Sequence, residues 1–236
     1  MKKYMLIVLT LAILCVGLLG CIALVGNETP ETDEEIISTS KKVTYVYMQA
    51  SYAFFPNDLD DLEMNSDVIV LARVLPGSVN VMLTTPEERG DLGFTRTELE
   101  LLQIFSGDLA VGEILTVVEP YFVVETDYEI QVRYFANYRP STPNQEYIFF
   151  LTKYDGDFPK YIGTYNILGL HGGRFPVLSG LMTPATALDE RSGVSSRSVE
   201  DFTNLELNLG HGNSTAYRRI FEEVIERYFG QIHASN

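Results

Sequence analysis

The sequence is poor in cysteine, tryptophan and positive charge. Of its 236 residues, 2 are Cys and none is Trp. Two cysteines are too few for a disulfide framework or for a zinc site made only of thiolates. Lys and Arg number 17 against 32 Asp and Glu, which gives a formal net charge of -15. Because proteins that bind nucleic acids need a basic surface, this balance argues against a nucleic acid as partner.

Apolar residues, by contrast, are well represented. They make up 46% of the chain, a share that is typical of globular proteins and too high for a disordered one. The length allows one domain, or at most two small ones. No internal repeat is visible, so we expect a folded protein with a hydrophobic core of its own.

The N-terminus has the pattern of a secretory signal. Met1-Lys2-Lys3 is a short positive region, and uncharged residues follow as far as Gly26. Within this stretch, Leu18-Leu19-Gly20-Cys21 resembles the bacterial lipobox, in which the Cys is linked to diacylglycerol and becomes the new N-terminus. The resemblance implies that residues 1–20 are a lipoprotein signal peptide and that Cys21 is the site of lipidation.

Two alternatives to this assignment stay open. Cys15 is also preceded by apolar residues, but the apolar core before it is shorter. The apolar run is moreover long enough to span a bilayer, and would then be an uncleaved signal anchor. Both the lipoprotein and the anchor leave the lysines in the cytoplasm and place the rest of the chain outside. We therefore expect a protein held at the extracytoplasmic face of the cell membrane.

The remainder of the chain divides into a tether and one domain. Residues 21–41 are predicted to be a flexible acidic tether, because the segment from Asn27 to Glu35 is rich in acids, contains Pro30 and shows no hydrophobic periodicity. Residues 42–236 are predicted to form a single β-rich domain with a C-terminal helix over 214–229.

Short apolar segments separated by turn residues predict the β-rich part. We expect about seven or eight strands in an antiparallel OB-like β-barrel or sandwich. These strands are expected among ten candidate segments, which are 43–48, 68–74, 79–83, 94–104, 113–118, 121–125, 129–134, 146–154, 160–168 and 174–178. Residues 57–64 read as one or two helical turns.

Apolar residues with helical spacing predict the C-terminal helix, which Gly230 is expected to end. The buried side is expected to carry Tyr217, Ile220, Phe221, Val224, Ile225 and Tyr228. The other side is expected to carry Arg218, Glu222, Glu223, Glu226 and Arg227.

Several strand and turn motifs occur in an order that resembles a known family. The motifs are Ser66-Asp67-Val68-Ile69-Val70, Phe105-Ser106-Gly107-Asp108 with Val111-Gly112-Glu113, Val118-Glu119-Pro120-Tyr121, Glu146-Tyr147-Ile148-Phe149-Phe150-Leu151 and Gly173-Arg174-Phe175. They resemble a family of uncharacterised secreted proteins and lipoproteins of Gram-positive bacteria over about residues 58–178. The chain departs from that family at Phe105-Ser106-Gly107, where a basic residue usually precedes the Gly. The resemblance implies a fold and a compartment rather than an activity.

The same strand order is similar to that of netrin-like and tissue-inhibitor-like domains, which are OB-type barrels. Those domains depend on an N-terminal Cys pair and on disulfides. Neither is expected here, because Cys15 would leave with the signal peptide and Cys21 would carry the lipid. The similarity therefore implies a barrel, and the protease-inhibiting chemistry of those domains is not carried over.

Candidates for a metal site are few. Asp58, Asp60, Asp61 and Glu63 supply clustered oxygen ligands of the kind that calcium prefers. The glycine of an EF-hand loop is missing, and acids are also favoured in the first turn of a helix by its dipole. No pattern points to a cofactor.

Candidates for catalysis are equally sparse. His171 and His211 both lie in glycine-containing turns and would form a metal or catalytic pair only if the fold brought them together. His233 lies near the C-terminus. No metalloprotease, nucleophile-elbow or phosphate-loop motif is present. A pair of carboxylates remains open among Glu113, Glu119, Glu125 and Glu129.

Aromatic residues suggest a ligand surface. The residues that crowd one region are Tyr121, Phe122, Tyr128, Arg133, Tyr134 and Tyr138. Tyr is frequent at recognition surfaces, although it also suits strands in general.

These observations favour binding over catalysis. We predict a cell-surface lipoprotein that acts as a binding module for an envelope protein or a glycan. The alternative is a cell-envelope hydrolase that uses carboxylate or His chemistry. A solute-binding lipoprotein is disfavoured, because such proteins are usually longer and read as α/β repeats.

Overall fold

The computed structural model describes the chain between residues 41 and 234, with gaps. The described residues are 41–49, 54, 56–85, 91–136, 138–178, 198–207, 209 and 215–234. The chain divides into two units, residues 1–40 and 41–236, and every described residue belongs to the second. The predicted signal peptide, Cys21 and nearly all of the tether therefore lie outside the described residues, as does His211. None of the helices in the described ranges has both the length and the apolar character needed to cross a membrane.

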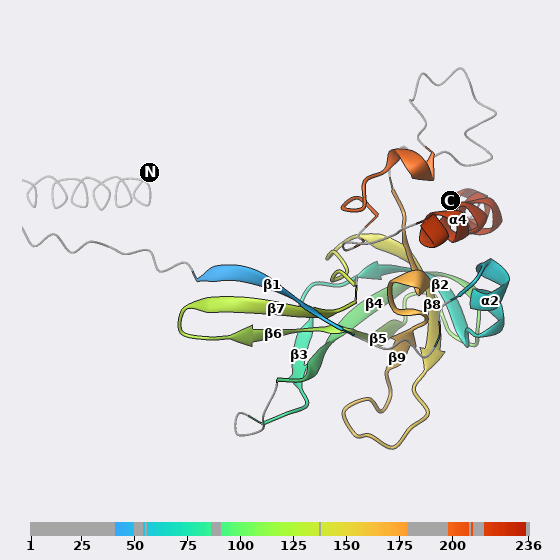
Figure 1. The fold of residues 1–236 in the computed structure, drawn as a ribbon. Helices are drawn as coiled ribbons and strands as arrows, with labels where there is room; N and C mark the ends of the chain where they lie inside the picture. Colours follow the sequence, from blue (N-terminus) through green and yellow to red (C-terminus); the bar gives the residue numbers. More distant parts are fainter. Residues whose placement is uncertain are drawn as a thin grey trace, which may run out of the picture. The chain divides into compact units, whose positions relative to one another are not determined.

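Five strands close a barrel (Figure 1). Its strands are β2 (Val68–Val74), β4 (Gly93–Ser106), β5 (Ile114–Glu119), β8 (Glu146–Lys153) and β9 (Tyr165–Ile167). Around the barrel, β2 pairs with β4, β4 with β5, β5 with β9, β9 with β8 and β8 with β2. In chain order this is first, second, third, fifth and fourth, with β5 and β9 parallel, which is the topology of an OB-type barrel.

The prediction of a mainly β, OB-like barrel with a C-terminal helix is confirmed. Two further short strands extend the barrel sheet: β3 (Val79–Met82) pairs with β4, and β10 (Arg174–Pro176) pairs with β8. The candidate strand at 160–168 shortens to the three residues of β9, since the chain before it forms a loop. Most of the strand pairs are antiparallel, as expected, and two pairs, β5–β9 and β1–β7, are parallel.

Two of the barrel strands, β2 and β8, bury both of their faces. On β2, Val68, Val70, Ala72 and Val74 face the barrel interior, whereas Ile69 and Leu71 belong to a second apolar cluster outside it. β8 divides in the same way between the two clusters. The second cluster is completed by α2 (Leu59–Met64), by η2 (Val199–Asp201) and by the C-terminal helix.

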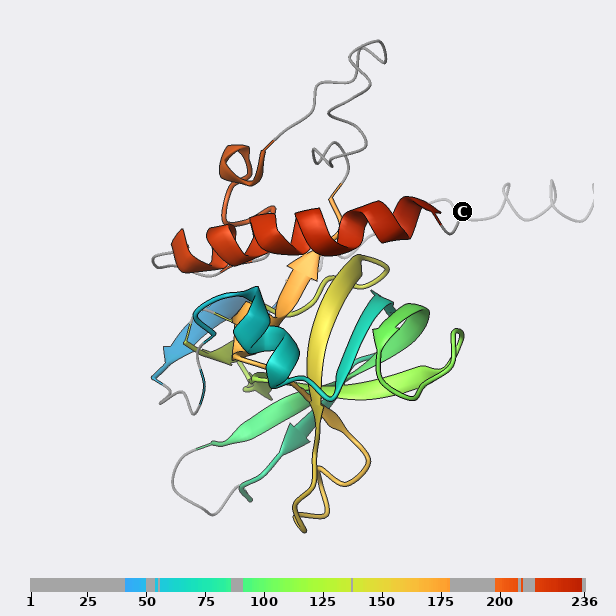
Figure 2. The ribbon, with the colours of Figure 1, turned by 90° about the vertical axis from the view of Figure 1, so that its right-hand side faces the viewer.

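The C-terminal helix lies across the barrel beside α2 (Figure 2). It comprises α4 (Thr215–Val224), a π-helical turn η3 (Ile225–Phe229) and α5 (Gly230–Ala234). All six residues predicted for its buried side are buried. Gly230 does not end the helix, because it adopts an ordinary right-handed helical conformation and the helix continues to Ala234.

Arg218 is also buried, contrary to the prediction that it lies on the exposed side of the helix. Its guanidinium donates hydrogen bonds to the carbonyl oxygens of Val199 and Phe202, at 2.6 and 2.8 Å. The side chain therefore ties the helix to the segment that contains η2, and this long-range capping of carbonyls overrides the helical hydrophobic pattern.

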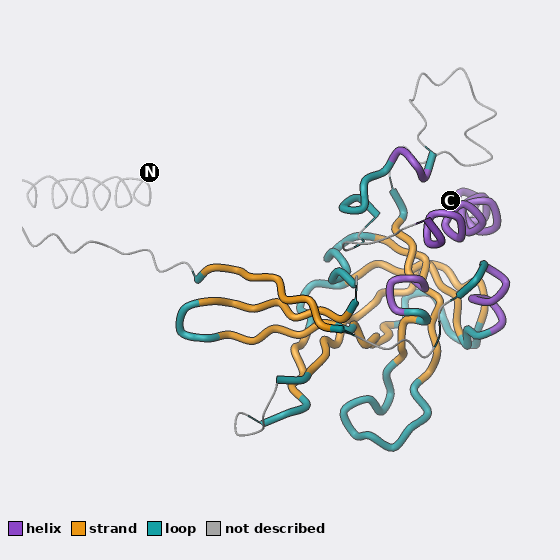
Figure 3. The backbone as a smooth tube through the Cα atoms, in the orientation of Figure 1, coloured by secondary structure: helices purple, strands orange, loops and turns teal. Residues whose placement is uncertain are grey.

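Three strands form an arm that projects from the barrel (Figures 1 and 3). They are β1 (Lys42–Met48), β6 (Tyr121–Glu125) and β7 (Glu129–Phe135), in the spatial order β1-β7-β6. β6 and β7 form the expected hairpin. β1 precedes all the barrel strands in the sequence and pairs parallel with β7.

Candidate functional site

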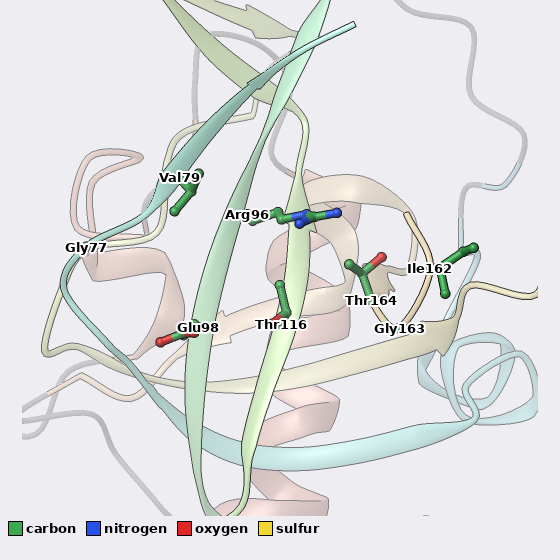
Figure 4. Close-up of a pocket in the computed structure, with 8 residues that line it drawn as sticks. All are labelled: Gly77, Val79, Arg96, Glu98, Thr116, Ile162, Gly163 and Thr164. Carbon is green, nitrogen blue, oxygen red and sulfur yellow. The ribbon is translucent and has the colours of Figure 1, made fainter. Parts of the chain in front are cut away.

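A shallow hollow of about 290 Å³ lies on the outer face of β4 and β5 (Figure 4). Arg96 and Glu98 of β4 and Thr116 of β5 line its floor. One wall comes from the connection between β2 and β4, at Gly77 and Val79. The other wall comes from the loop between β8 and β9, at residues 162–164. We call this site the β4–β5 hollow.

The floor is polar because the strands alternate. On β4, Thr95, Thr97 and Leu99 are buried in the barrel, so Arg96 and Glu98 point outward. Glu98 is paired with Thr116 across the two strands, which places a carboxylate next to a hydroxyl. The sequence pattern had already separated these two faces of β4.

The loop between β8 and β9 is held in place by aromatic packing. The ring of Tyr161 lies 4.4 Å from that of Phe94 on β4 and 5.2 Å from that of Tyr154. Thr164 donates its hydroxyl to the carbonyl of Tyr161 at 2.7 Å. These contacts make the wall a fixed part of the barrel surface.

The floor and the two walls are also linked directly. The guanidinium of Arg96 donates to the carbonyl of Lys160, and the ammonium of Lys160 donates to the carbonyl of Met82 at 2.5 Å. Gly77 and Gly163 both have positive φ, at 98° and 78°, while an added Cβ at either would meet nothing within 4 Å. Backbone conformation rather than space therefore requires glycine in each wall.

Three of the six residues predicted as a ligand surface are buried and cannot contribute their side chains to one. Tyr121, Phe122 and Tyr138 are buried in the core, with 8%, 0% and 0% of their surface exposed. Arg133 forms an ion pair with Asp91 at 2.6 Å, and Tyr134 is half-buried. Of the six, only Tyr128 is fully open, at 86% exposure. The aromatic clustering in the sequence reflects mainly the inward faces of strands.

A buried polar network closes one end of the barrel, around the ion pair of Glu119 and Arg174. One carboxylate oxygen of Glu119 accepts hydrogen bonds from the Tyr138 hydroxyl at 2.5 Å, from the Ser141 amide at 2.8 Å and from Arg174 at 3.3 Å. The other accepts from the hydroxyl of Thr97. Burial raises the pKa of Tyr138 well above its usual range, so the phenol stays protonated and donates.

This network was not predicted from the sequence. Its members are far apart along the chain, and no spacing connects them. The signal that could have found it is a charged residue at the end of an apolar strand: Glu119 ends β5, and Arg174 begins the short β10. Such residues inside a barrel need partners, because burying an unpaired charge is costly.

The carboxylates considered for catalysis each have partners of their own. Glu119 belongs to the buried network, and Glu125 pairs with Lys41 at 2.7 Å. Glu129 accepts from the hydroxyl of Thr44 at 2.7 Å, and Glu113 accepts from the amide of Ala110 at 3.1 Å. Glu125 and Glu129 flank the turn between β6 and β7, and a catalytic pair among the four stays a prediction.

The acids considered for a metal site also have other partners. Asp58 caps α2 through the amide of Asp61, and Asp61 accepts from Asn57. Asp60 and Glu63 both bind Arg227 of the C-terminal helix, at 2.9 and 2.6 Å. Within the described ranges, no three or more His, Cys, Asp or Glu residues are grouped so as to hold a metal ion.

His171 lies in η1 (Leu170–Gly173), next to the buried network. Burial and the nearby charge of Arg174 lower the pKa of His171 from 6.5 to about 4, so its ring is neutral at physiological pH. Its proposed pairing with His211 stays a prediction, because His211 lies outside the described residues. Nothing is described of the side chain of His233.

Comparison of the chain with models of protein families, with curated proteins and with solved structures finds no match in any of the three. The resemblance to secreted proteins and lipoproteins of Gram-positive bacteria stays a prediction.

Proposed function

We propose that the protein is an extracytoplasmic binding module, held at the cell membrane by a lipid on Cys21, whose ligand site is the β4–β5 hollow. The N-terminal pattern supports the anchor: a short positive region, an apolar run and a Cys preceded by Leu-Leu-Gly. An uncleaved signal anchor would leave the domain in the same compartment.

The position of the hollow carries the proposal. OB-type barrels bind oligonucleotides and oligosaccharides on the face of their second and third strands, between the connection of strands 1 and 2 and that of strands 4 and 5. In this barrel those strands are β4 and β5, and the two connections are the walls of the hollow. The location of the site is inferred from the fold, because OB-type barrels share a binding face. The class of ligand has to be argued from the chemistry of the site itself.

The chemistry of the site favours a glycan over a nucleic acid. A formal net charge of -15 would repel a phosphate backbone. A guanidinium, a carboxylate and a hydroxyl on the floor offer both donors and acceptors to sugar hydroxyls and amides. Val79 and Ile162, which are 58% and 62% exposed, supply apolar rims against which the carbon face of a sugar can pack.

A hydrolase is not favoured by any specific observation. Glycoside hydrolysis generally needs two carboxyl groups on either side of the scissile bond. Glu98 is the one carboxylate among the residues that line the hollow. His171 is half-buried and does not line the hollow, and its ring lies 6.3 Å from that of Tyr217 on the C-terminal helix.

Calorimetric titration of the full chain in detergent with soluble peptidoglycan disaccharides and longer oligomers tests the proposal. We expect saturable binding that weakens about ten- to a hundredfold in Glu98→Gln, since a hydrogen bond to a charged group contributes about 1.5–3 kcal/mol. Thr116→Arg, which fills the floor, should abolish binding. Glu222→Gln, an exposed substitution on α4, is the matched control and should bind as the wild type does.

Two results would overturn the proposal. Equal affinity of Thr116→Arg and Glu222→Gln would remove the hollow as the site. Absence of binding to every glycan would remove the ligand class, and an envelope protein would then be the remaining partner from the sequence prediction.

A further inference from the structure

The outer edge of β1 is open and apolar. Among the described strands, β1 pairs only with β7, so no described strand pairs with its other edge. Three alternate residues of this strand, Val43, Tyr45 and Tyr47, point to one face of the arm and are 51%, 65% and 58% exposed. Long, exposed, apolar edge strands are templates for pairing with another chain.

The other described edges are protected. On the opposite side of the arm, the side-chain amide of Asn80 donates to the carbonyl of Val123 in β6 and accepts from its amide, both at 2.8 Å. β10 contains Pro176, and β3 has four residues. β1 has seven residues without Pro, and its register with β7 contains no bulge.

We propose that β1 pairs antiparallel with β1 of a second copy of the chain, about a twofold axis at Tyr45. Tyr45 is the midpoint of the seven-residue strand, so this register pairs every residue of β1. The two copies of Tyr45 lie opposite each other, and Val43 lies opposite Tyr47 of the second copy. The two arms then form one continuous six-stranded sheet.

The sequence of β1 is suited to a copy of itself in this register. Aromatic and β-branched residues directly opposite each other stabilise antiparallel strands, and like charges destabilise them. The one charged residue of the strand, Lys42, lies opposite Met48 of the second copy, so no like charges meet. Because Asn80 blocks the β6 edge, association stops at a closed dimer and does not propagate into a filament.

Substitution at the twofold axis tests the pairing. Tyr45→Lys and Tyr45→Glu each place two like charges directly opposite and remove the Tyr pair, and each should weaken dimerisation about two- to thirtyfold. An equimolar mixture of the two variants should restore the dimer, because Lys then faces Glu. Detergent-corrected light scattering of the full chain over a concentration series measures all four samples, the fourth being the wild type.

Tyr128→Lys is the matched control, because Tyr128 is an exposed Tyr at the turn of the same arm but not on β1. It should dimerise as the wild type does. Circular dichroism of each variant verifies folding, which an exposed side chain at position 45 should not disturb. A monomeric wild type at all concentrations, or failure of the mixture to restore the dimer, would overturn the proposal, and neither result bears on the β4–β5 hollow.

Discussion

The ion pair of Glu119 and Arg174 is the most consequential contact between single residues. Both side chains are almost fully buried, and their surroundings supply partners for the carboxylate and the guanidinium alike. Arg174 also lies over the rings of Tyr138 and Tyr147, at 4.6 and 5.3 Å. The pair and its hydrogen bonds join β5, β10 and residues 138–141, the segment that follows β7.

Arg174→Met should therefore destabilise the fold strongly. The substitution leaves the carboxylate of Glu119 buried without its counter-charge, which typically costs about 3–5 kcal/mol. Urea unfolding measures the loss. Arg73→Met is the control, because Arg73 bridges Glu100 and Glu146 on the surface with 40% of its side chain exposed, and a much smaller change is expected. Equal effects of the two substitutions would contradict a structural role for the buried pair.

His171 should make the free energy of unfolding depend on pH. The unfolded chain protonates this residue below about pH 6.5, whereas burial and Arg174 lower its pKa to about 4 in the folded protein. The unfolded state thus binds more protons between pH 6.5 and 4, so stability falls as the pH falls through that window, by about 3 kcal/mol in total.

Unfolding free energies of the wild type and of His171→Gln across pH 4 to 7 measure this dependence. The exposed carboxylates titrate in both proteins, so the difference between the two curves isolates His171. A difference that stays constant over the whole range would show that the ring is not buried in its neutral form.

At the scale of elements, Arg218 holds the C-terminal helix against η2. Arg218→Ala leaves the carbonyls of Val199 and Phe202 without these donors, and we expect a loss of about 2 kcal/mol together with earlier unfolding of the helix. Glu222→Ala, at an exposed position of the same helix, is the control. Thermal unfolding followed by circular dichroism compares them, and indistinguishable transitions would refute the role of Arg218.

Local patterns predicted the elements well, because each depends on neighbours in sequence. Alternation located the strands, and helical periodicity located all six buried residues of the C-terminal helix. The prediction was wrong for Arg218 and Gly230. A buried Arg is compatible with an apolar helix face when distant carbonyl oxygens accept hydrogen bonds from its guanidinium. A Gly is tolerated inside a helix when tertiary packing stabilises the residues that follow it.

At the scale of the whole molecule, the strand order was anticipated through a resemblance to OB-type barrels. The parallel pairing of β1 with β7 was not, because it joins residues more than eighty positions apart. The hollow was missed for the same reason. Alternation along β4 places Arg96 and Glu98 on its outward face. The walls of the hollow, however, come from two connections that only the closed barrel brings together.

The position of the ligand is the most direct test of a binding module with its site on β4 and β5. Methyl NMR signals of Ile162 and Val79 can be followed while the full chain in detergent is titrated with peptidoglycan oligomers. We predict that these two signals shift and that the signal of Val43, an equally exposed residue on the arm, does not. Shifts at Val43 with none at Ile162 and Val79 would contradict the proposed site.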